Sequence, residues 1–472
     1  MPDEAGFLSA AALADSYRRR ERSAVEVTRE VLDRIDRLDG EVNAFVTVTP
    51  ERALQDAERA DRALRDGTAG PLCGVPYTLK DLVPTRGIPT GYGSRVWRDP
   101  APAADAPVAE RLAASGAVLL GKTTVPEHGF KGDSGNPLNG PCANPWDPGR
   151  TPGGSSSGAA VAAGVGYGPL HQGSDGAGSI RIPSAFCGVF GHKPSFGLVA
   201  HPPASGFALS HLGPIARTVQ DAALLLDAMA GLDPRDRLSV PPPEPSFADA
   251  LRRPLPRLRI AFSPDLGYAA VEPDVARIVA TAAREFADLG HGVEEVDLGL
   301  DDPWWIERDL WLSMFAASCP DALDHRDEVS PGLVRLVEQA AERSSQAVGE
   351  ALDARAGLLL QIESRLSGYD LLLCPSLPCT AFPLGDDQPA TVAGQAYDDL
   401  GWTQFCYPFN LTGQPACSVP CGLSDGLPVG LQIVGRRLED ALVLRAAAAY
   451  QESHPSILPS CQPRPTPSSP PT

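Results

Sequence analysis

The stretch GSDGAGSIRIP, residues 173–183, places one hydroxyl, that of Ser179, at the end of a run with almost no side-chain bulk. A serine that attacks a carbonyl needs a base within hydrogen-bonding reach, and it needs donors aimed at the oxygen that becomes negative. The backbone N–H groups of Gly176, Ala177, Gly178 and Ser179 can supply those donors, because a backbone approaches a substrate closely only where side chains are missing. The pattern therefore predicts a serine nucleophile beside an oxyanion hole.

Two other interpretations of the serine-containing stretches are weaker. A plain glycine-rich turn or a phosphate-binding loop would also be bare, but residues 173–183 lack the Lys-Ser/Thr ending of a P-loop and the full dinucleotide-binding spacing. The segment GSSSG, residues 154–158, formally satisfies G-x-S-x-G with Ser156 at its centre. That motif requires a preceding strand and a later acid and histidine, whereas a loop rich in proline and glycine precedes this one.

Lysine is rare in this chain and is confined to one block. Among 40 basic residues the lysines are Lys80, Lys122, Lys131 and Lys193. Arginine is in effect never deprotonated, whereas a buried lysine can lose its proton and act as a base. Biased coding toward arginine is the alternative explanation. Lys80 ends the apolar stretch GVPYTLKDL, residues 74–82, and is the strongest candidate for a base.

The first half of the chain alternates predicted helices and strands around these residues. Apolar residues at helical spacing predict helices within 9–67, and residues 74–82 predict a buried strand. Residues 108–127 predict a helix, a glycine turn and a strand. A small-residue helix is expected at 158–166, and an amphipathic helix at 213–231. This alternation is typical of an α/β unit with a largely buried sheet.

The second half is less distinctive. It begins with a proline-rich stretch near residue 239, and helices are expected over 303–366. Residues 369–376 predict another strand, and the block 396–451 predicts loop, strand and helix. The segment 454–472, rich in proline and serine, is expected to be disordered.

Composition bounds the partners and the compartment. A formal net charge of −19 repels the phosphates of nucleic acids and the surfaces of anionic membranes. The ten cysteines are scattered without metal-binding spacing, so neither a metal nor a cofactor is expected. The N-terminal stretch lacks a signal-peptide layout and no apolar run reaches spanning length, which favours a cytoplasmic protein.

Several long motifs resemble the amidase signature family of serine hydrolases. They include GVPYTLKDL, NPWDPGRTPGGSSSGAAVAAG, GSDGAGSIRIPSAFCGVFGHKPSFG and PFNLTGQPACSVPCGLSDGLPVGLQIVGR. The resemblance implies one α/β domain over residues 1–453, with a central mixed β-sheet covered by helices on both faces. Within it, 74–231 would be the catalytic block, 239–400 a variable substrate-pocket region and 408–436 a C-terminal block.

The resemblance also implies a Ser–cis-Ser–Lys triad. Lys80 would be the base, Ser155 the bridging serine after a cis peptide bond from Gly154, and Ser179 the nucleophile that forms the acyl-enzyme. Neutral Lys80 would accept a proton relayed through Ser155 from Ser179. Its pKa must therefore lie several units below that of a free lysine, through burial and nearby donors.

Charged and polar neighbours of these motifs give further expectations. Asp175 and Arg181 flank the bare loop and can pin its shape, or they form a purely structural salt bridge. Asp81 would raise the pKa of Lys80 if it touched it, so its carboxylate is expected to point toward backbone amides. His192 is expected to be partly exposed.

The leading functional hypothesis is hydrolysis of a carboxylic amide. The segment DDPWWIERDLWLSMF offers Trp304, Trp305, Trp311 and Phe315, which would line an aromatic or hydrophobic acyl site or else pack in the core. Lining would favour aryl or hydrophobic amides or carbamates (urethanes) as substrates.

Two alternatives belong to other classes. One is the glutamine-hydrolysing component of a tRNA-dependent amidotransferase, which works in a complex, and the other is a non-catalytic binding protein on the same fold. The expected partner is a small-molecule substrate rather than nucleic acid or membrane, and the chain is expected to be a monomer or homodimer.

Overall fold

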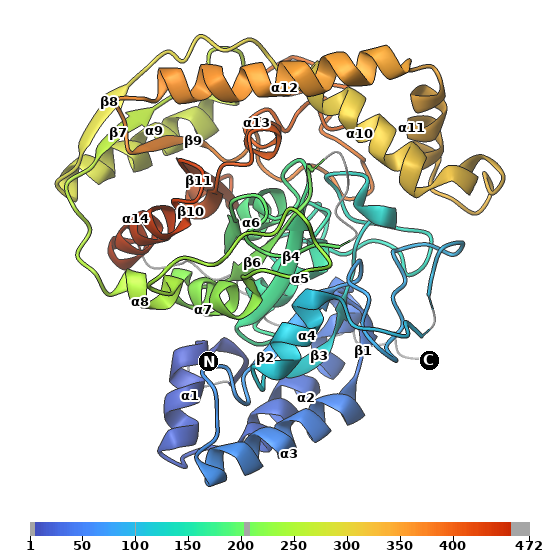
Figure 1. The fold of residues 1–472 in the computed structure, drawn as a ribbon, viewed down its shortest axis with the longest axis vertical. Coiled ribbons are helices and arrows are strands. Elements are labelled where there is room, and N and C mark those ends of the chain that lie inside the picture. The colour runs from blue at the N-terminus through green and yellow to red at the C-terminus, as the bar shows by residue number, and fades with distance from the viewer. Residues whose placement is uncertain (1–4, 100, 203–207, 455–472) are drawn as a thin grey trace, which may run out of the picture.

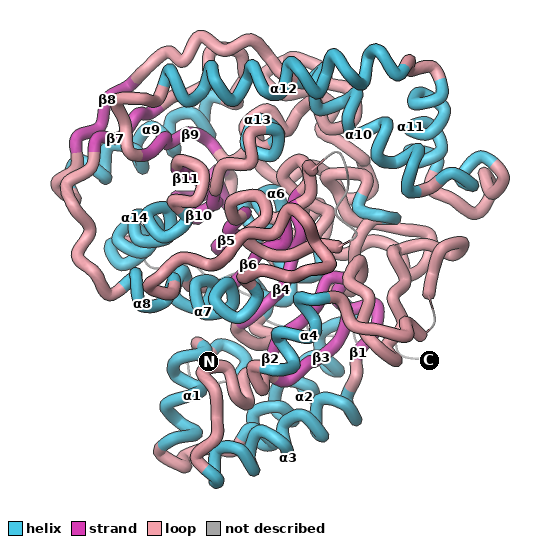
Figure 2. The backbone as a smooth tube through the Cα atoms, in the orientation of Figure 1, coloured by secondary structure: helices cyan, strands magenta, loops and turns pink. Residues whose placement is uncertain are grey.

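The computed structural model describes residues 5–99, 101–202 and 208–454. Its strands form one sheet that runs through the middle of the molecule (Figures 1 and 2). The strands in chain order are β1 (Phe45–Val48), β2 (Pro76–Lys80), β3 (Val118–Thr123), β4 (Leu170–Asp175), β5 (Phe190–Lys193), β6 (His211–Ala216), β7 (Arg259–Phe262), β8 (Gly292–Glu295), β9 (Leu371–Pro375), β10 (Ala416–Ser424) and β11 (Leu427–Gly435).

The sheet is mixed, with the order β1-β3-β2-β4-β6-β5-β10-β11-β9-β7-β8. Parallel pairing joins β3, β2 and β4, and it joins β9, β7 and β8 at the other end. Antiparallel pairs connect these two groups through β6, β5, β10 and β11. The predicted mixed α/β fold is confirmed.

Helices surround this sheet. The α-helices are α1 (Ala10–Arg18), α2 (Ala24–Val42), α3 (Pro50–Asp66), α4 (Pro107–Ala114), α5 (Ser157–Val165), α6 (Arg181–Cys187), α7 (Val219–Met229), α8 (Phe247–Leu251), α9 (Pro273–Asp288), α10 (Trp304–Ser318), α11 (Pro331–Ala341), α12 (Ser345–Arg365), α13 (Tyr407–Leu411) and α14 (Asp440–Ser453). The 3-10 helices are Ala5–Phe7, Glu127–Gly129 and Pro320–Leu323.

The helices fall into groups along the sheet. In Figure 1, α1, α2 and α3 lie at the end that carries β1, whereas α10, α11 and α12 gather at the opposite end. The helices α6, α9 and α14 all contact β10 and β11. The variable region thus contributes both the helical group α10–α12 and three strands of the sheet.

Sequence explains the elements nearest the site. Every residue of β2, β4 and α5 is buried, as expected for continuous apolar or small-residue runs. In α5 the small residues permit close packing: a Cβ on Gly158 would overlap the carbonyl oxygen of Ala44. The helix predicted over 213–231 begins only at Val219, because its first residues belong to β6, which pairs with β4 and β5.

Two further expectations concern the chain as a whole. Within the described ranges, no helix combines the length and apolar character that crossing a bilayer requires. The segment expected to be disordered, 454–472, lies outside the described residues except for His454, which follows α14.

Candidate active site

Lys80 ends β2 and is completely buried. Its Nζ lies 2.7 Å from Ser155 Oγ, 3.0 Å from Ser156 Oγ and 2.9 Å from Ser174 Oγ. The structure therefore brings together Lys80 and Ser155, as expected. It adds Ser156 and Ser174, whose contact with Lys80 the sequence did not indicate.

The hydroxyl of Ser156 has little choice of hydrogen-bonding role. It donates to the carbonyl oxygen of Ser174 at 3.1 Å and accepts from the N–H of Ser174 at 3.1 Å. Its only proton is thus committed, so Ser156 Oγ accepts a hydrogen from the Lys80 amine. With one N–H so directed, the lone pair of a neutral Lys80 can face another hydroxyl.

Burial sets the charge of this amine. Loss of hydration lowers the pKa of Lys80 to about 7, against a smaller raising effect of the negative charge on Asp175. The neighbouring Asp81 turns away, as expected: its Oδ2 accepts from the N–H of Gly91 at 2.8 Å, and its Oδ1 lies 3.5 Å from Lys122 Nζ. Near pH 7 a substantial fraction of Lys80 is therefore an uncharged amine.

Two glycines hold Ser155 in place. The peptide bond from Gly154 to Ser155 is cis, and a Cβ on Gly154 would overlap the carbonyl oxygen of Asp133. From the other side, a Cβ on Gly129 would lie 2.9 Å from Ser155 Oγ. Side chains larger than hydrogen at either position would displace backbone or the Ser155 hydroxyl.

Ser179 follows the bare loop that joins β4 to α6. A Cβ on Gly176 would lie 2.8 Å from the indole of Trp311, and one on Gly178 would lie 2.8 Å from Cys406 Cβ. Gly178 also has a φ of +119°, which L side chains rarely adopt. The bareness of the loop is thus explained by packing and backbone conformation as well as by access for a substrate.

The expected set of oxyanion donors requires one correction. The N–H of Gly178 donates to Asp175 Oδ1 at 2.8 Å, so it is occupied. It points back because Asp175 sits at the start of the turn and captures the amides that close it. The N–H groups of Gly176, Ala177 and Ser179 donate to no other described residue. They remain the candidate donors.

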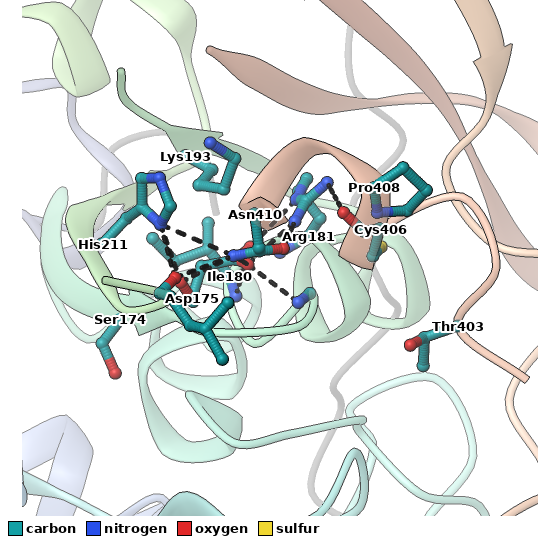
Figure 3. A network of polar contacts seen from close by, with 12 residues as sticks. Ser174, Asp175, Ile180, Arg181, Lys193, His211, Thr403, Cys406, Pro408 and Asn410 are labelled. Carbon is teal, nitrogen blue, oxygen red and sulfur yellow. Dashed lines mark hydrogen bonds and ion pairs between the residues drawn. The ribbon is translucent and has the colours of Figure 1, made fainter. Parts of the chain in front are cut away.

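Asp175 and Arg181 form the centre of a buried network (Figure 3). Arg181 Nη2 lies 2.8 Å from Asp175 Oδ1, and Arg181 Nε lies 2.9 Å from Asp175 Oδ2. Burial alone would raise the pKa of Asp175, but Arg181 holds it well below its usual range. The same carboxylate accepts from the N–H of Ile180, so it pins both ends of the loop.

The C-terminal block completes this network. Asn410 Nδ2 donates to the carbonyl oxygen and to Oδ1 of Asp175, each at 2.9 Å. Gln432 Oε1 accepts from Arg181 Nη1 at 2.9 Å. Sequence reasoning missed both residues, although each is an amide side chain within an otherwise apolar run, which is a signal for a buried polar contact.

His192 differs from its expected exposure. It is completely buried on β5, where its Nε2 lies 3.0 Å from Asp440 Oδ1. The carboxylate of Asp440, at the start of α14, supplies the polar partner that allows an imidazole in the core.

A cavity of about 210 Å³ opens over these groups. Lys80, Ser155, Ser174, Gly176 and Ser179 lie on its wall. The remaining lining residues are Leu82, Val83, His128, Gly129, His201, Ser210, Leu212, Trp311, Met314, Phe315 and Ser318. Sequence reasoning missed His128. In the described part of the chain, no cluster of three or more His, Cys, Asp or Glu side chains is arranged to hold a metal ion.

Of the four aromatic residues expected at the pocket, the structure brings two to it. Trp311 and Phe315, four residues apart on α10, line the cavity. Trp305 is 49% exposed and outside the lining, because six residues turn it to another face of the helix. Trp304 shares the face of Trp311 but lies about 10 Å further along the axis, and it packs against Tyr407 instead.

Comparisons with known proteins agree with this geometry. The sequence model of the family described as Amidase matches residues 26–444. An acylamidase of Rhodococcus erythropolis is 38% identical over 461 residues, covering 95% of this chain and 96% of the relative. The GatA-type component of the glutamyl-tRNA(Gln) amidotransferase of Moorella thermoacetica is also 38% identical, over 479 residues, with 95% and 96% coverage.

Solved structures give the same assignment. A bacterial aryl acylamidase of the amidase signature family superposes with a TM-score of 0.89 at 31% identity, covering 95% of this chain and 96% of that chain. A 6-aminohexanoate cyclic dimer hydrolase superposes with a TM-score of 0.86 at 29% identity, covering 96% and 98%. With a family match across nearly its whole length, the chain belongs to the amidase signature family of amide-hydrolysing enzymes.

Proposed function

We propose that the enzyme cleaves the carbon–nitrogen bond of a carboxylic amide through an acyl-enzyme on Ser179. The neutral amine of Lys80 takes the proton of Ser155, which in turn takes that of Ser179 as its Oγ attacks the carbonyl carbon. The N–H groups of Gly176, Ala177 and Ser179 hold the negative oxygen. The relay returns a proton to the departing nitrogen, and water then releases the acid.

One observation carries this proposal. A buried amine with a lowered pKa lies 2.7 Å from a serine hydroxyl, on the wall of a cavity that a second serine shares. A general base must be uncharged and within hydrogen-bonding reach of the proton that it accepts, and Lys80 meets both conditions toward Ser155 near neutral pH.

The cavity favours an uncharged, partly apolar substrate. Leu82, Leu212, Trp311, Met314 and Phe315 supply apolar wall. We infer aryl or hydrophobic amides as substrates, in keeping with the acylamidase and aryl acylamidase relatives. Carbamates would require no further catalytic group, since the same attack on the carbonyl applies with an alkoxy substituent.

Glutamine hydrolysis within an amidotransferase complex is the second candidate, favoured by the 38% identity to an amidotransferase component. Free glutamine carries an ammonium and a carboxylate, which need counter-charges when buried. Among the described residues that line the cavity, none is Arg, Asp or Glu, and Lys80 is engaged by three serines. The lining therefore favours the amidase.

The test is a panel of primary amides, anilides, carbamates and glutamine, assayed with the wild-type enzyme and three variants. Ser179→Ala should lower kcat by about 10³–10⁶-fold, and Lys80→Arg should be similarly inactive because arginine cannot serve as a base. Ser155→Ala should lower kcat by about 10²–10⁴-fold. Near-normal turnover by any variant would remove that residue from the proposed relay.

Labelling separates the remaining alternatives. A serine-directed phosphonate should modify Ser179 of the wild-type enzyme, with the site located by mass spectrometry. Absence of labelling in folded protein would favour a binding protein. Ammonia release from glutamine only in the presence of the other amidotransferase components would favour the amidotransferase.

A further inference from the structure

Two hydrogen-bonding atoms on the cavity wall are buried and have no hydrogen-bond partner among the described residues. They are Nε2 of His128 and Nε1 of Trp311. Buried polar side-chain atoms are bonded in the large majority of cases, because leaving one unsatisfied costs free energy. Two such atoms on one cavity point to a substrate group that satisfies them.

The ring of Trp311 directs its N–H away from the oxyanion loop. Its Cζ3 faces Gly176, where a Cβ would lie 2.8 Å away. Within the indole, Cζ3 is para to the carbon that bears Nε1, so the N–H lies on the far side of the ring system. An indole N–H can only donate. It therefore requires an acceptor on a part of the substrate away from the scissile carbonyl.

The imidazole of His128 is held firmly. It stacks on Tyr92 with ring centroids 5.4 Å apart and meets Trp97 edge-on at 4.9 Å. Its backbone N–H donates to the carbonyl oxygen of Tyr92 at 2.7 Å. Burial lowers the pKa of His128 to about 4, so the ring is neutral at pH 7 and has one donor and one acceptor nitrogen.

We propose that His128 and Trp311 recognise a hydroxyl group on the substrate, so that the enzyme prefers amides whose aromatic part carries one. A hydroxyl both donates and accepts, so it fits the imidazole in either tautomer and the indole N–H. A charged substituent is disfavoured because the described lining offers no free counter-charge. This inference rests on the proposed amidase function and names the substrate class of that same site.

The experiment compares kcat/KM for hydroxyl-bearing amides with that for methyl-bearing amides of nearly equal size. One pair, hydroxybenzamide and methylbenzamide, places the substituent on the acyl side. The other, hydroxyacetanilide and methylacetanilide, places it on the leaving side, and both use meta and para isomers. The wild-type enzyme should favour the hydroxyl about tenfold or more in at least one pair, as expected for one or two hydrogen bonds.

His128→Phe and Trp311→Phe should each reduce that preference by about threefold or more. The ratio is measured within one enzyme preparation, so a loss of active protein cancels. His128→Gln, whose Nε2 can replace that of the imidazole, should retain more of the preference than His128→Phe. This rescue distinguishes recognition from a merely structural role for the ring.

Trp305→Phe on the same helix and His325→Phe, whose side chain is 42% exposed, are the matched controls, and both should keep the wild-type ratio. A wild-type ratio near one in both pairs would overturn the proposal. An unchanged ratio in either cavity variant would also overturn it. If the wild-type enzyme hydrolyses none of these amides, the proposed function itself fails.

Discussion

At the scale of single residues, one amine decides when the site can work. Burial lowers the pKa of Lys80 to about 7, and only the uncharged amine can accept a proton. We expect kcat/KM to fall about tenfold per pH unit below pH 7 and to level off above it. Initial rates across pH 5–9 in buffers of constant ionic strength measure this limb. A flat profile between pH 5 and 8 would contradict it.

Ser156 should tune that limb without being part of the relay. Its oxygen accepts from the Lys80 amine, which stabilises the ammonium more than the neutral amine. Ser156→Ala should therefore lower the pKa of Lys80 and move the midpoint of the acid limb down by about 0.5–1 pH unit. The same pH–rate measurement tests this, and a midpoint that rises or stays put would refute the assigned hydrogen-bond direction.

The sequence indicated some of these residues and not others, for physical reasons. In an arginine-rich chain a lysine marked a special position, and Lys80, Lys122 and Lys193 are all completely buried. Lys80 and Ser155 came from long motifs. The contacts of Ser174 and His128 could not be predicted, because they depend on how β2, α5 and the loop before Phe130 meet in space.

At the scale of elements, the loop between β4 and α6 depends on its glycines. Gly178→Ala would add a Cβ at a φ of +119° and 2.8 Å from Cys406 Cβ. We expect a loss of about 1–3 kcal/mol in the free energy of unfolding, together with reduced kcat. In contrast, Gly40→Ala in α2 meets no atom within 4 Å and should stabilise by about 0.5–1 kcal/mol. Urea unfolding of both variants tests the contrast; equal effects would refute it.

The short helix α13 should act on the chemistry through Asn410. Asn410→Ala removes two hydrogen bonds to Asp175, so we expect a loss of about 1.5–3 kcal/mol in unfolding free energy. A displaced loop should also lower kcat by about 10–100-fold. Asn43→Ala, which loses two hydrogen bonds outside the cavity lining, is the control and should lower stability alone. Unchanged kcat in Asn410→Ala would limit that residue to stability.

Element boundaries were predictable where the pattern was local. The small-residue helix α5 and the strand β2 lie close to their expected ranges. Periodicity on α10 would have separated Trp311 and Phe315 from Trp305, but only the position of the helix against the loop decided that Trp304 lies too far along. Such axial placement depends on tertiary contacts that one segment does not encode.

At the scale of the molecule, excess negative charge should weaken the fold at low salt. A net charge of −19 repels itself, and raising salt from 0.01 to 0.1 M shortens the screening length from about 30 to about 10 Å. We expect Tm at pH 7.5 to rise by about 2–5 °C over that range. Near the sequence pI of about 4.8 the increase should vanish. A Tm that falls with salt at pH 7.5 would contradict the expectation.

Class and architecture followed from alternation of helices and strands, but strand order did not. The pairing of β10 with β5 and of β11 with β9 joins segments far apart in the chain. Antiparallel partners of this kind have no local signature, since any buried apolar strand satisfies the same pattern. Family motifs therefore indicated the sheet type, and only the structure gave the positions of its strands.

The wall that α10 contributes comes from a stretch of chain remote from β2, α5 and the β4–α6 turn. Met314 and Ser318 can accordingly be exchanged without disturbing the proton relay, whereas position 129 tolerates no side chain beside Ser155. Directed evolution toward bulkier compounds should concentrate its diversity on that one helix and leave the rest of the cavity untouched.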